Sequence, residues 1–340
     1  MRVLNKLWGE TMLTIQKIAN ELNISKATVS RAISGAGRIS VKTRDRVNSY
    51  ISEQGYRPNA IAQSLAQSKS FSIGVFLPKD INATLTSFFY ECIVGICEVT
   101  SASNYDILLI MTERNDTADL ERLVSNQKID GLILTRMYEN DMITQLLFKM
   151  KIPFLLIGES GDDRIIEVYN DYVEASCALT TSMIRAGSKK PLFIGGDSSH
   201  IVMKNRFLGF QKAHEDENLT LDSFLVMQDV KTDYYLERNL PKVLEQTRPD
   251  GIITADDVIC EWTLPILDKL GYSIPKDIRI ASCYNNNSLE RYNPAITAVD
   301  INTTLLGKTA GHIMIDMLAG KKVEQRTAID YTIHLCKSTM

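Results

Sequence analysis

The chain has 340 residues, of which 44% are hydrophobic and 23% charged, and a formal net charge of −3. This length predicts two or three domains, and the composition is that of a globular protein. No apolar run reaches the ~20 residues of a membrane helix, and residues 1–12 lack the apolar segment of a signal peptide, so we expect a cytoplasmic location. The six cysteines show no CxxC spacing, which argues against a zinc site or disulfide framework and predicts free thiols.

Charge is unevenly distributed along the chain. Residues 1–70 contain 11 Lys and Arg against 4 Asp and Glu, a balance of +7. The remaining residues contain 27 against 37, a balance of −10. A basic N-terminal segment on an acidic body predicts that only this segment contacts a polyanion.

Three short amphipathic helices are expected in the basic segment. Each follows a residue that can cap a helix and buries an apolar stripe. The caps are Thr14, Ser25 and Ser40, and the stripes lie within Ile15–Leu22, Val29–Ile33 and Val47–Ile51. The first two helices are separated by a very short turn at Asn23, which tolerates the left-handed conformation. This arrangement predicts a helix-turn-helix.

The outer face of the second helix carries the residues suited to DNA. Lys26, Ala27, Ser30 and Arg31 point away from the apolar stripe, as a helix in the major groove requires. Arg31 can form paired hydrogen bonds with guanine or contact a phosphate, and Thr28 and Ser30 can donate to phosphates. The alternative is a solvated helix in an ordinary bundle, which the basic charge disfavours.

From Phe71 the pattern changes to short apolar strands alternating with amphipathic helices. The expected strands are Ser72–Leu77, Tyr105–Met111, Gly131–Thr135, Phe154–Ile157, Pro191–Gly195, Phe224–Gln228, Gly251–Thr254 and Arg279–Ser282. Expected helices include Phe88–Thr100, Tyr172–Arg185, Met203–Glu217, Asp257–Leu270 and Leu305–Leu318. This alternation predicts an α/β core of two doubly wound parallel-sheet subdomains with a ligand cleft between them. We divide the chain into a headpiece at 1–58, a capped short helix and polar linker at 59–70, and the core at 71–340.

The N-terminal residues resemble the headpiece of LacI/GalR family regulators. The resemblance runs through Thr14–Arg31, Ser40–Arg44 and Gly55–Ala66. It implies a dimer that binds a pseudo-palindromic operator, with Lys26, Ala27 and Arg31 reading base edges. It also implies a hinge helix after Asn59 whose Leu65 wedges into the minor groove. The DNA-binding residues predicted here are Thr14, Ser25, Lys26, Ala27, Thr28, Ser30, Arg31, Arg38, Asn59, Ala62 and Leu65.

The resemblance continues more weakly to residue 339 and implies a periplasmic-binding-protein-like core. Its motifs include Ser87–Glu91, Arg206–Phe210 and Thr254–Asp257, and they place Arg206 and Asp257 at the effector. Departures from the family pattern include Asp256 in place of Asn and Gly187-Ser188 in place of Gly-His. The family-like headpiece begins at about Leu13, so we expect translation to start at Met12.

The chemistry of three core residues fits a polyhydroxylated effector. Arg206 and Asp257 can bind adjacent sugar hydroxyls, and Phe88 can pack on the ring. We therefore expect an uncharged mono- or disaccharide, with a nucleobase as the alternative. Three structural interpretations stay open: Arg206 caps or pairs on the surface, Asp257 only caps its helix, and Phe88 is core.

Enzyme motifs are incomplete in this sequence. Gly35-Ala36-Gly37 lacks the third glycine of a dinucleotide loop, and His214-Glu215 lacks the second histidine of a zinc helix. We expect no enzyme activity, cofactor, metal or membrane contact. A solute-binding protein is the competing class, which the headpiece disfavours. The sequence thus predicts a DNA-binding regulator of transcription, a repressor controlled by a sugar-like effector, acting as a homodimer or tetramer.

Overall fold

The computed structural model describes residues 14–34, 38–54, 67, 69–79, 86–139 and 141–340. The chain divides into two compact units, Met1–Lys69 and Ser70–Met340, and each is described by itself. The predicted hinge helix, with Asn59, Ala62 and Leu65, and the proposed start at Met12 lie outside the described residues.

The N-terminal unit contains α2 (Ile15–Glu21), α3 (Lys26–Ser34) and α4 (Val41–Glu53). The turn between α2 and α3 contains Asn23 at φ 51°, in the left-handed region, as predicted. The three helices bury Ile18, Val29 and Val47 completely. The apolar stripes predicted from the sequence therefore form one small helical core, and the helix-turn-helix is confirmed.

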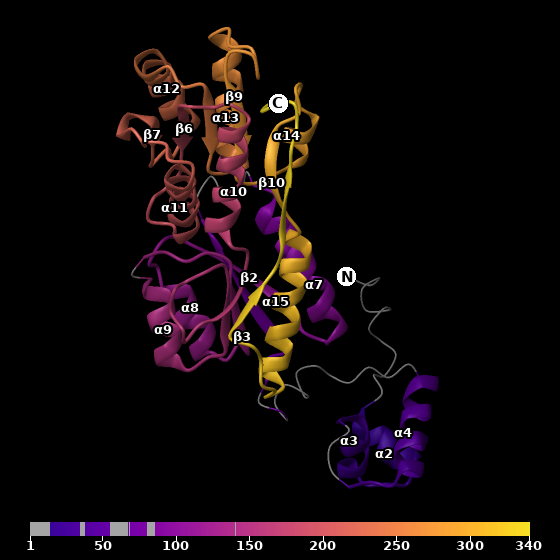
Figure 1. Ribbon diagram of the computed structural model, residues 1–340. Coiled ribbons are helices and arrows are strands. Elements are labelled where there is room, and N and C mark those ends of the chain that lie inside the picture. The colour runs from indigo at the N-terminus through magenta and orange to yellow at the C-terminus, as the bar shows by residue number, and fades with distance from the viewer. Residues whose placement is uncertain (1–13, 35–37, 55–66, 68, 80–85, 140) are drawn as a thin grey trace, which may run out of the picture. The chain divides into compact units, whose positions relative to one another are not determined.

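The core unit contains two six-stranded sheets with helices packed on them (Figure 1). The first sheet has the order β11-β5-β4-β3-β1-β2 and is parallel. Its strands are β1 (Ser72–Pro78), β2 (Asp106–Thr112), β3 (Gly131–Leu134), β4 (Phe154–Ile157), β5 (Ile166–Tyr169) and β11 (Arg326–Ala328). Its helices are α7 (Phe88–Ala102), α8 (Ala118–Ser125), α9 (Met142–Met150) and α15 (Thr303–Leu318).

The second sheet has the order β12-β10-β9-β8-β6-β7, and only the pairing of β12 with β10 is antiparallel. Its strands are β6 (Pro191–Ile194), β7 (Val226–Met227), β8 (Gly251–Thr254), β9 (Arg279–Ser282), β10 (Thr297–Ile301) and β12 (Tyr331–His334). Its helices are α10 (Tyr172–Arg185), α11 (Ile201–Asp216), α12 (Asp233–Thr247), α13 (Asp257–Lys269) and α14 (Asn287–Arg291).

The chain passes between the two sheets three times: after β5, after β10 and after β11. Two of these crossings are joined, because the Asn170 side-chain amide donates to the Ile329 carbonyl at 2.7 Å. The subdomains are therefore interleaved in sequence. The two sheets are therefore joined by three connections.

Helix pairs in the core approach closely at glycines. A Cβ on Gly95 of α7 would clash with the Thr304 carbonyl of α15, and one on Gly307 would clash with the Cys92 carbonyl. The neighbouring α7 and α15 in Figure 1 cover one face of the first sheet. These glycines are thus required by packing between helices.

The structure differs from the sequence-based expectation at several elements. The expected strand Phe224–Gln228 is wrong in its first half, because Ser223–Leu225 form a 3₁₀ turn before a two-residue β7. The helix expected from Met203 begins at Ile201. Strands β5 and β10 to β12 were not among the expected strands, and the residues of β11 and β12 are exposed or half-buried. No helix in the described ranges is long and apolar enough to cross a membrane.

Candidate functional site

The outward face of α3 presents the residues predicted to contact DNA. Lys26, Ala27, Ser30 and Arg31 are all exposed on this helix. Arg38, which lies between α3 and α4 in the sequence, is exposed as well. A short helix with one buried face and a basic, polar outer face has the form required to enter a major groove.

Three of the predicted DNA-contacting hydroxyls also stabilise the headpiece. The Thr14 hydroxyl accepts from the Lys17 N–H at 3.3 Å and caps α2. The Ser25 hydroxyl accepts from the Thr28 N–H at 3.0 Å, and the Ser25 and Thr28 hydroxyls are 2.9 Å apart. These side chains order the start of α2, the turn and the start of α3.

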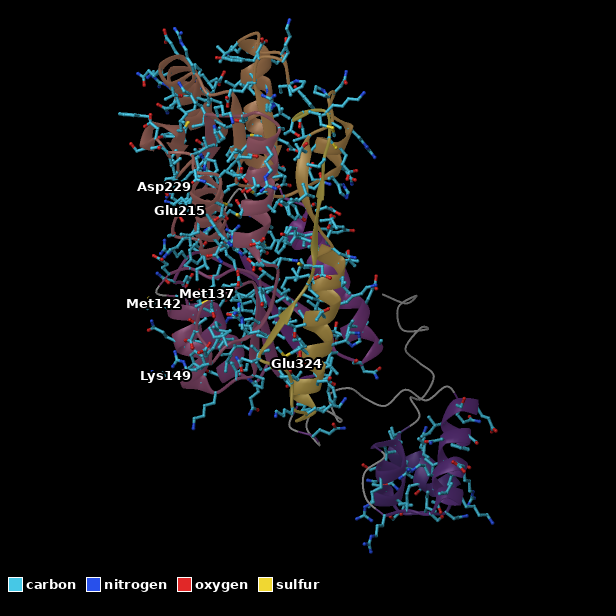
Figure 2. All side chains as sticks on the ribbon, in the orientation of Figure 1. Met137, Met142, Lys149, Glu215, Asp229 and Glu324 are labelled. Atoms are coloured by element: carbon cyan, nitrogen blue, oxygen red, sulfur yellow. The ribbon has the colours of Figure 1, made fainter. Side chains whose placement is uncertain are left out.

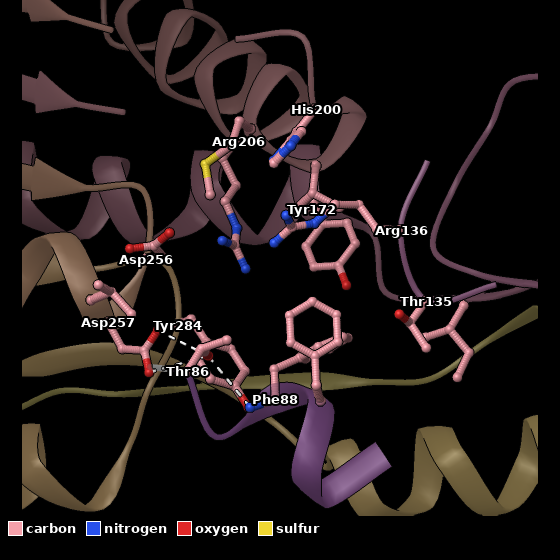
Figure 3. Close-up of a pocket in the computed structure, with 15 residues that line it drawn as sticks. Thr86, Phe88, Thr135, Arg136, Tyr172, His200, Arg206, Asp256, Asp257 and Tyr284 are labelled. Carbon is pink, nitrogen blue, oxygen red and sulfur yellow. Dashed lines mark hydrogen bonds between the residues drawn. The ribbon is translucent and has the colours of Figure 1, made fainter. Parts of the chain in front are cut away.

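The second candidate site is a cavity between the two sheets, with an empty volume of about 650 Å³ including its mouth (Figure 3). The cavity lies beyond the carboxyl ends of β3, β4, β8 and β9. Its lining includes Thr86, Phe88, Phe89, Thr135, Arg136, Tyr172, His200, Arg206, Asp256, Asp257 and Tyr284. The three predicted effector residues are therefore brought together.

Arg206 extends from α11 into this cavity and is only 6% exposed. Its guanidinium carbon lies 5.2 Å from the centre of the Tyr172 ring. Its Nε is buried and has no hydrogen-bond partner among the described residues. The interpretation that Arg206 pairs on the surface is wrong. A buried charged donor without a partner is costly, so the site favours a ligand that accepts from it.

Asp256 and Asp257 follow β8 and have different roles. Asp256 caps α13 by accepting from the Ile259 N–H at 2.8 Å. The interpretation that Asp257 only caps the helix is therefore wrong. Asp257 is 1% exposed, and its carboxylate accepts from the Asn286 amide at 3.0 Å and from the Thr86 hydroxyl at 3.3 Å.

Burial and, to a smaller extent, the neighbouring Asp256 charge together raise the pKa of the Asp257 carboxyl to about 7. Burial also raises the pKa of Asp256. Asp257 can thus change its protonation state near neutral pH, accepting from a ligand when ionised and donating to it when protonated.

Phe88 begins α7 and is half-buried at the cavity wall. Its ring packs edge-on against Phe89 at 5.3 Å and against Tyr284 at 5.9 Å between ring centres. It contacts the cores of both sheets, so the core interpretation is correct in part. Figure 3 nevertheless shows its ring directed into the cavity opposite Arg206, where it offers an apolar surface to a ligand.

Sequence reasoning missed several residues that line the cavity. Arg136 follows β3, and its guanidinium carbon lies 5.3 Å from the centre of the Phe89 ring. His200 also lines the cavity and packs edge-on against Tyr138 at 4.5 Å between ring centres. Arg136 and Asp256 could have been predicted from the sequence. Both are polar residues shortly after a predicted parallel strand, where ligands of such sheets bind.

Contacts across the cleft hold the two sheets together beside this cavity. Tyr138 and His200 form an isolated antiparallel bridge, and the Ile201 N–H donates to the Met137 carbonyl at 3.4 Å. Met137, labelled in Figure 2, marks this junction. Lys204 forms an ion pair with Glu139 on the opposite subdomain. The two subdomains are therefore in direct contact beside the cavity.

The described residues form neither a metal site nor a disulfide. In the described ranges, no group of three His, Cys, Asp or Glu is placed to hold a metal. All six cysteines are free, as predicted from their spacing. Cys97 and Cys336 are half-buried and the other four are buried.

Parts of both units of the chain match models of known protein families. Residues 14–59 match the model of bacterial regulatory proteins of the lacI family, and residues 180–339 match a periplasmic binding protein-like domain. The HTH-type transcriptional regulator MalR of Staphylococcus xylosus is 30% identical over 320 residues, covering 92% of this chain and 93% of that protein.

Two solved structures have a similar fold. The lac repressor dimer bound to operator and the anti-inducer ONPF has a TM-score of 0.79 and 20% identity, covering 97% of this chain and all of that one. The complex of the transcriptional regulator CelR with cellobiose has a TM-score of 0.72 and 22% identity, covering 96% and 99%. The fold of this chain is thus shared with both.

Proposed function

Because this chain belongs to the lacI family of bacterial regulatory proteins, we propose that it is a repressor whose operator affinity is controlled by a sugar bound between the two sheets. Like its relatives, the chain is a DNA-binding regulator of transcription and not an enzyme. The proposal adds the direction of regulation, the class of effector and the residues that contact each partner.

The observation that carries the effector proposal is the buried guanidinium of Arg206, whose Nε lacks a partner among the described residues. Asp257 lies in the same cavity with a carboxylate that can accept from hydroxyls. A charged donor and a carboxylate together match adjacent hydroxyls of a sugar. Phe88 adds an apolar surface for a face of the ring. A relative in complex with cellobiose supports the same class of ligand.

For operator binding, we assign base reading to Lys26, Ala27 and Arg31 of α3. The remaining predicted contacts, Thr14, Ser25, Thr28, Ser30 and Arg38, are assigned to phosphates. Asn59, Ala62 and Leu65, outside the described residues, are assigned to a hinge helix in the minor groove. This assignment keeps the division into a headpiece at 1–58, a hinge and linker at 59–70, and a core at 71–340.

We place the regulator in the cytoplasm as a homodimer on a pseudo-palindromic operator. Closure of the two subdomains on the sugar would change how the pair of headpieces is presented. Such coupling between sites is typically ~1–3 kcal/mol, which changes operator affinity about 5- to 150-fold.

The test begins with thermal unfolding of the full chain in maltose, cellobiose, glucose, adenine or guanine. We expect a sugar to raise the melting temperature, because a ligand that binds only the folded state stabilises it. Gel shifts on duplexes selected from a random pool should then change with that sugar. Stabilisation by a nucleobase and by no sugar would instead identify the alternative effector. A duplex affinity that the best ligand does not alter would refute regulation through this cavity.

A further inference from the structure

Asp130 holds the start of the core unit through three hydrogen bonds. Its Oδ1 accepts from the Ser70 N–H at 2.7 Å and from the Ser70 hydroxyl at 2.9 Å. Its Oδ2 accepts from the Phe71 N–H at 2.9 Å. The Asp130 N–H in turn donates to the Ser72 carbonyl at 2.8 Å. We call this set of contacts the Asp130 clasp.

The clasp lies where the chain enters the core. The N-terminal unit ends at Lys69 and the core unit begins at Ser70. The two residues held by the carboxylate are therefore the first two of the core. Any force transmitted between the core and the DNA-binding unit along the chain passes through them.

The clasp and the effector cavity lie at opposite ends of the same strands. Asp130 directly precedes β3, and Thr135 and Arg136, which directly follow β3, line the cavity. The held segment continues into β1, which pairs with β3 in parallel from Ile73 opposite Gly131 onward. Two adjacent buried strands thus connect the cavity to the point where the linker leaves.

A matching clasp in the second sheet serves only the core. Asp250 directly precedes β8, as Asp130 precedes β3, and each is followed by glycine. Asp250 accepts from the Ser188 hydroxyl at 2.5 Å and from the N–H groups of Lys189 and Lys190 at 2.7 and 2.9 Å. This segment leads from α10 into β6, inside the core. The two clasps share their chemistry and differ in what precedes the held segment.

We propose that Asp130 is a positioning residue for operator binding, and that it fixes the point from which each linker leaves the core. The proposal rests on the proposed function, in which a dimer presents two headpieces to one operator. A linker fixed at Ser70 restricts the positions of the second headpiece once the first is bound. Release of the clasp adds Ser70 and Phe71 to the connection between the headpiece and the core, and a longer connection lowers the effective concentration of a tethered site.

The experiment compares full-length wild type, Asp130→Asn and Asp250→Asn on two DNA probes. One is a duplex with two half-sites selected by the wild-type chain from a random pool, and the other contains a single half-site. We expect Asp130→Asn to weaken binding to the two-site duplex by about 1.3-fold or more, the loss produced when linkers of about 12 residues each gain two, and to leave half-site affinity at its wild-type value. Asp250→Asn should change neither affinity. Ser70→Ala, which removes one of the three donors and leaves β3 unchanged, should give an intermediate loss.

Amide hydrogen exchange shows whether each clasp has opened. Asp130→Asn should reduce protection at Ser70 and Phe71, and Asp250→Asn should reduce it at Lys189 and Lys190. Equal binding of the two-site duplex by Asp130→Asn and wild type overturns the proposal, as does equal weakening on both probes. Weakening by Asp250→Asn to the same extent would show a general effect of core stability and also overturn it. A wild-type chain that selects no duplex refutes the proposed function together with the clasp's role.

Discussion

Asp256 and Asp257 are adjacent, yet the first caps α13 through the Ile259 N–H and the second accepts from Asn286 and faces the cavity. The cap satisfies an N–H at the start of α13, and the helix N-terminus favours negative charge at both carboxylates. Burial opposes that charge. At Asp257 the effect of burial exceeds that of the helix N-terminus, and the pKa is raised to about 7. One residue therefore fixes the helix and its neighbour provides a titratable acceptor.

Ligand affinity should rise with pH through the titration of Asp257. An ionised carboxylate accepts from a hydroxyl, so a ligand that requires this form binds about tenfold more tightly at pH 8 than at pH 6. Asp257→Asn should bind more weakly and lose this dependence. Calorimetry with the sugar that stabilises wild type most provides the measurement. Equal affinity of wild type at both pH values would show that Asp257 does not accept from the ligand.

The free protein should show the opposite trend from the same group. The folded state binds the Asp257 proton more tightly than the unfolded chain, since its pKa is raised from 3.8 to about 7. This group's contribution to stability is therefore present below pH 4 and lost as the pH rises to 7. The free energy of unfolding of Asp257→Asn, relative to wild type, should increase over this interval. Denaturation without ligand at pH 4.5 and 7.5 measures it, and a constant difference would contradict the raised pKa.

Asp256→Asn separates the two carboxylates. Asn is an effective helix cap, so α13 should remain intact, while loss of the Asp256 charge should lower the pKa of Asp257. The pH at which ligand affinity rises should move down accordingly. A midpoint that stays in place would show that burial alone raises the pKa.

Arg206→Met should separate ligand binding from stability. Methionine keeps an unbranched apolar stem and removes a buried charge that has an unsatisfied Nε. We expect sugar affinity to fall by ~1.5–3 kcal/mol, the value of a charge-assisted hydrogen bond, with no loss of melting temperature. Lys212→Met on the same helix removes an exposed charge paired with Glu174 and should alter neither quantity. Wild-type sugar affinity in Arg206→Met would mean that the ligand binds elsewhere.

Sequence reasoning succeeded where a feature depends on neighbours in the chain. The caps at Thr14, Ser25 and Ser40 were predicted from residue type and position, and each accepts a hydrogen bond from an N–H three residues later. Arg206 and Asp257 were found through motifs. Strand β12 depends on contacts between segments distant in sequence, such as the pairing of Ala298 with His334, which local pattern does not contain.

Gly95→Ala should destabilise the core strongly. The added Cβ would collide with the Thr304 backbone carbonyl, which cannot move without shifting α15 against α7. Overpacking of this kind typically costs ~1–3 kcal/mol. Gly196→Ala is the control, because its Cβ would meet only ordinary contacts at 3.5 Å and beyond. Urea denaturation of both variants measures the difference, and equal stabilities would refute the close helix contact.

Arg31→Ala tests the DNA assignment on the face of α3. Arg31 is exposed there and is not part of the small helical core, so the headpiece should fold normally. If its guanidinium reads a base, operator affinity should fall by ~1–3 kcal/mol, while affinity for unrelated DNA falls much less. Arg122→Ala, which removes an exposed charge from α8 of the core, should leave both affinities unchanged. The measurement is a titration of selected and scrambled duplexes at two salt concentrations. An equal loss on both duplexes, with a shallower salt dependence, would assign Arg31 to a phosphate and leave base reading to the rest of α3.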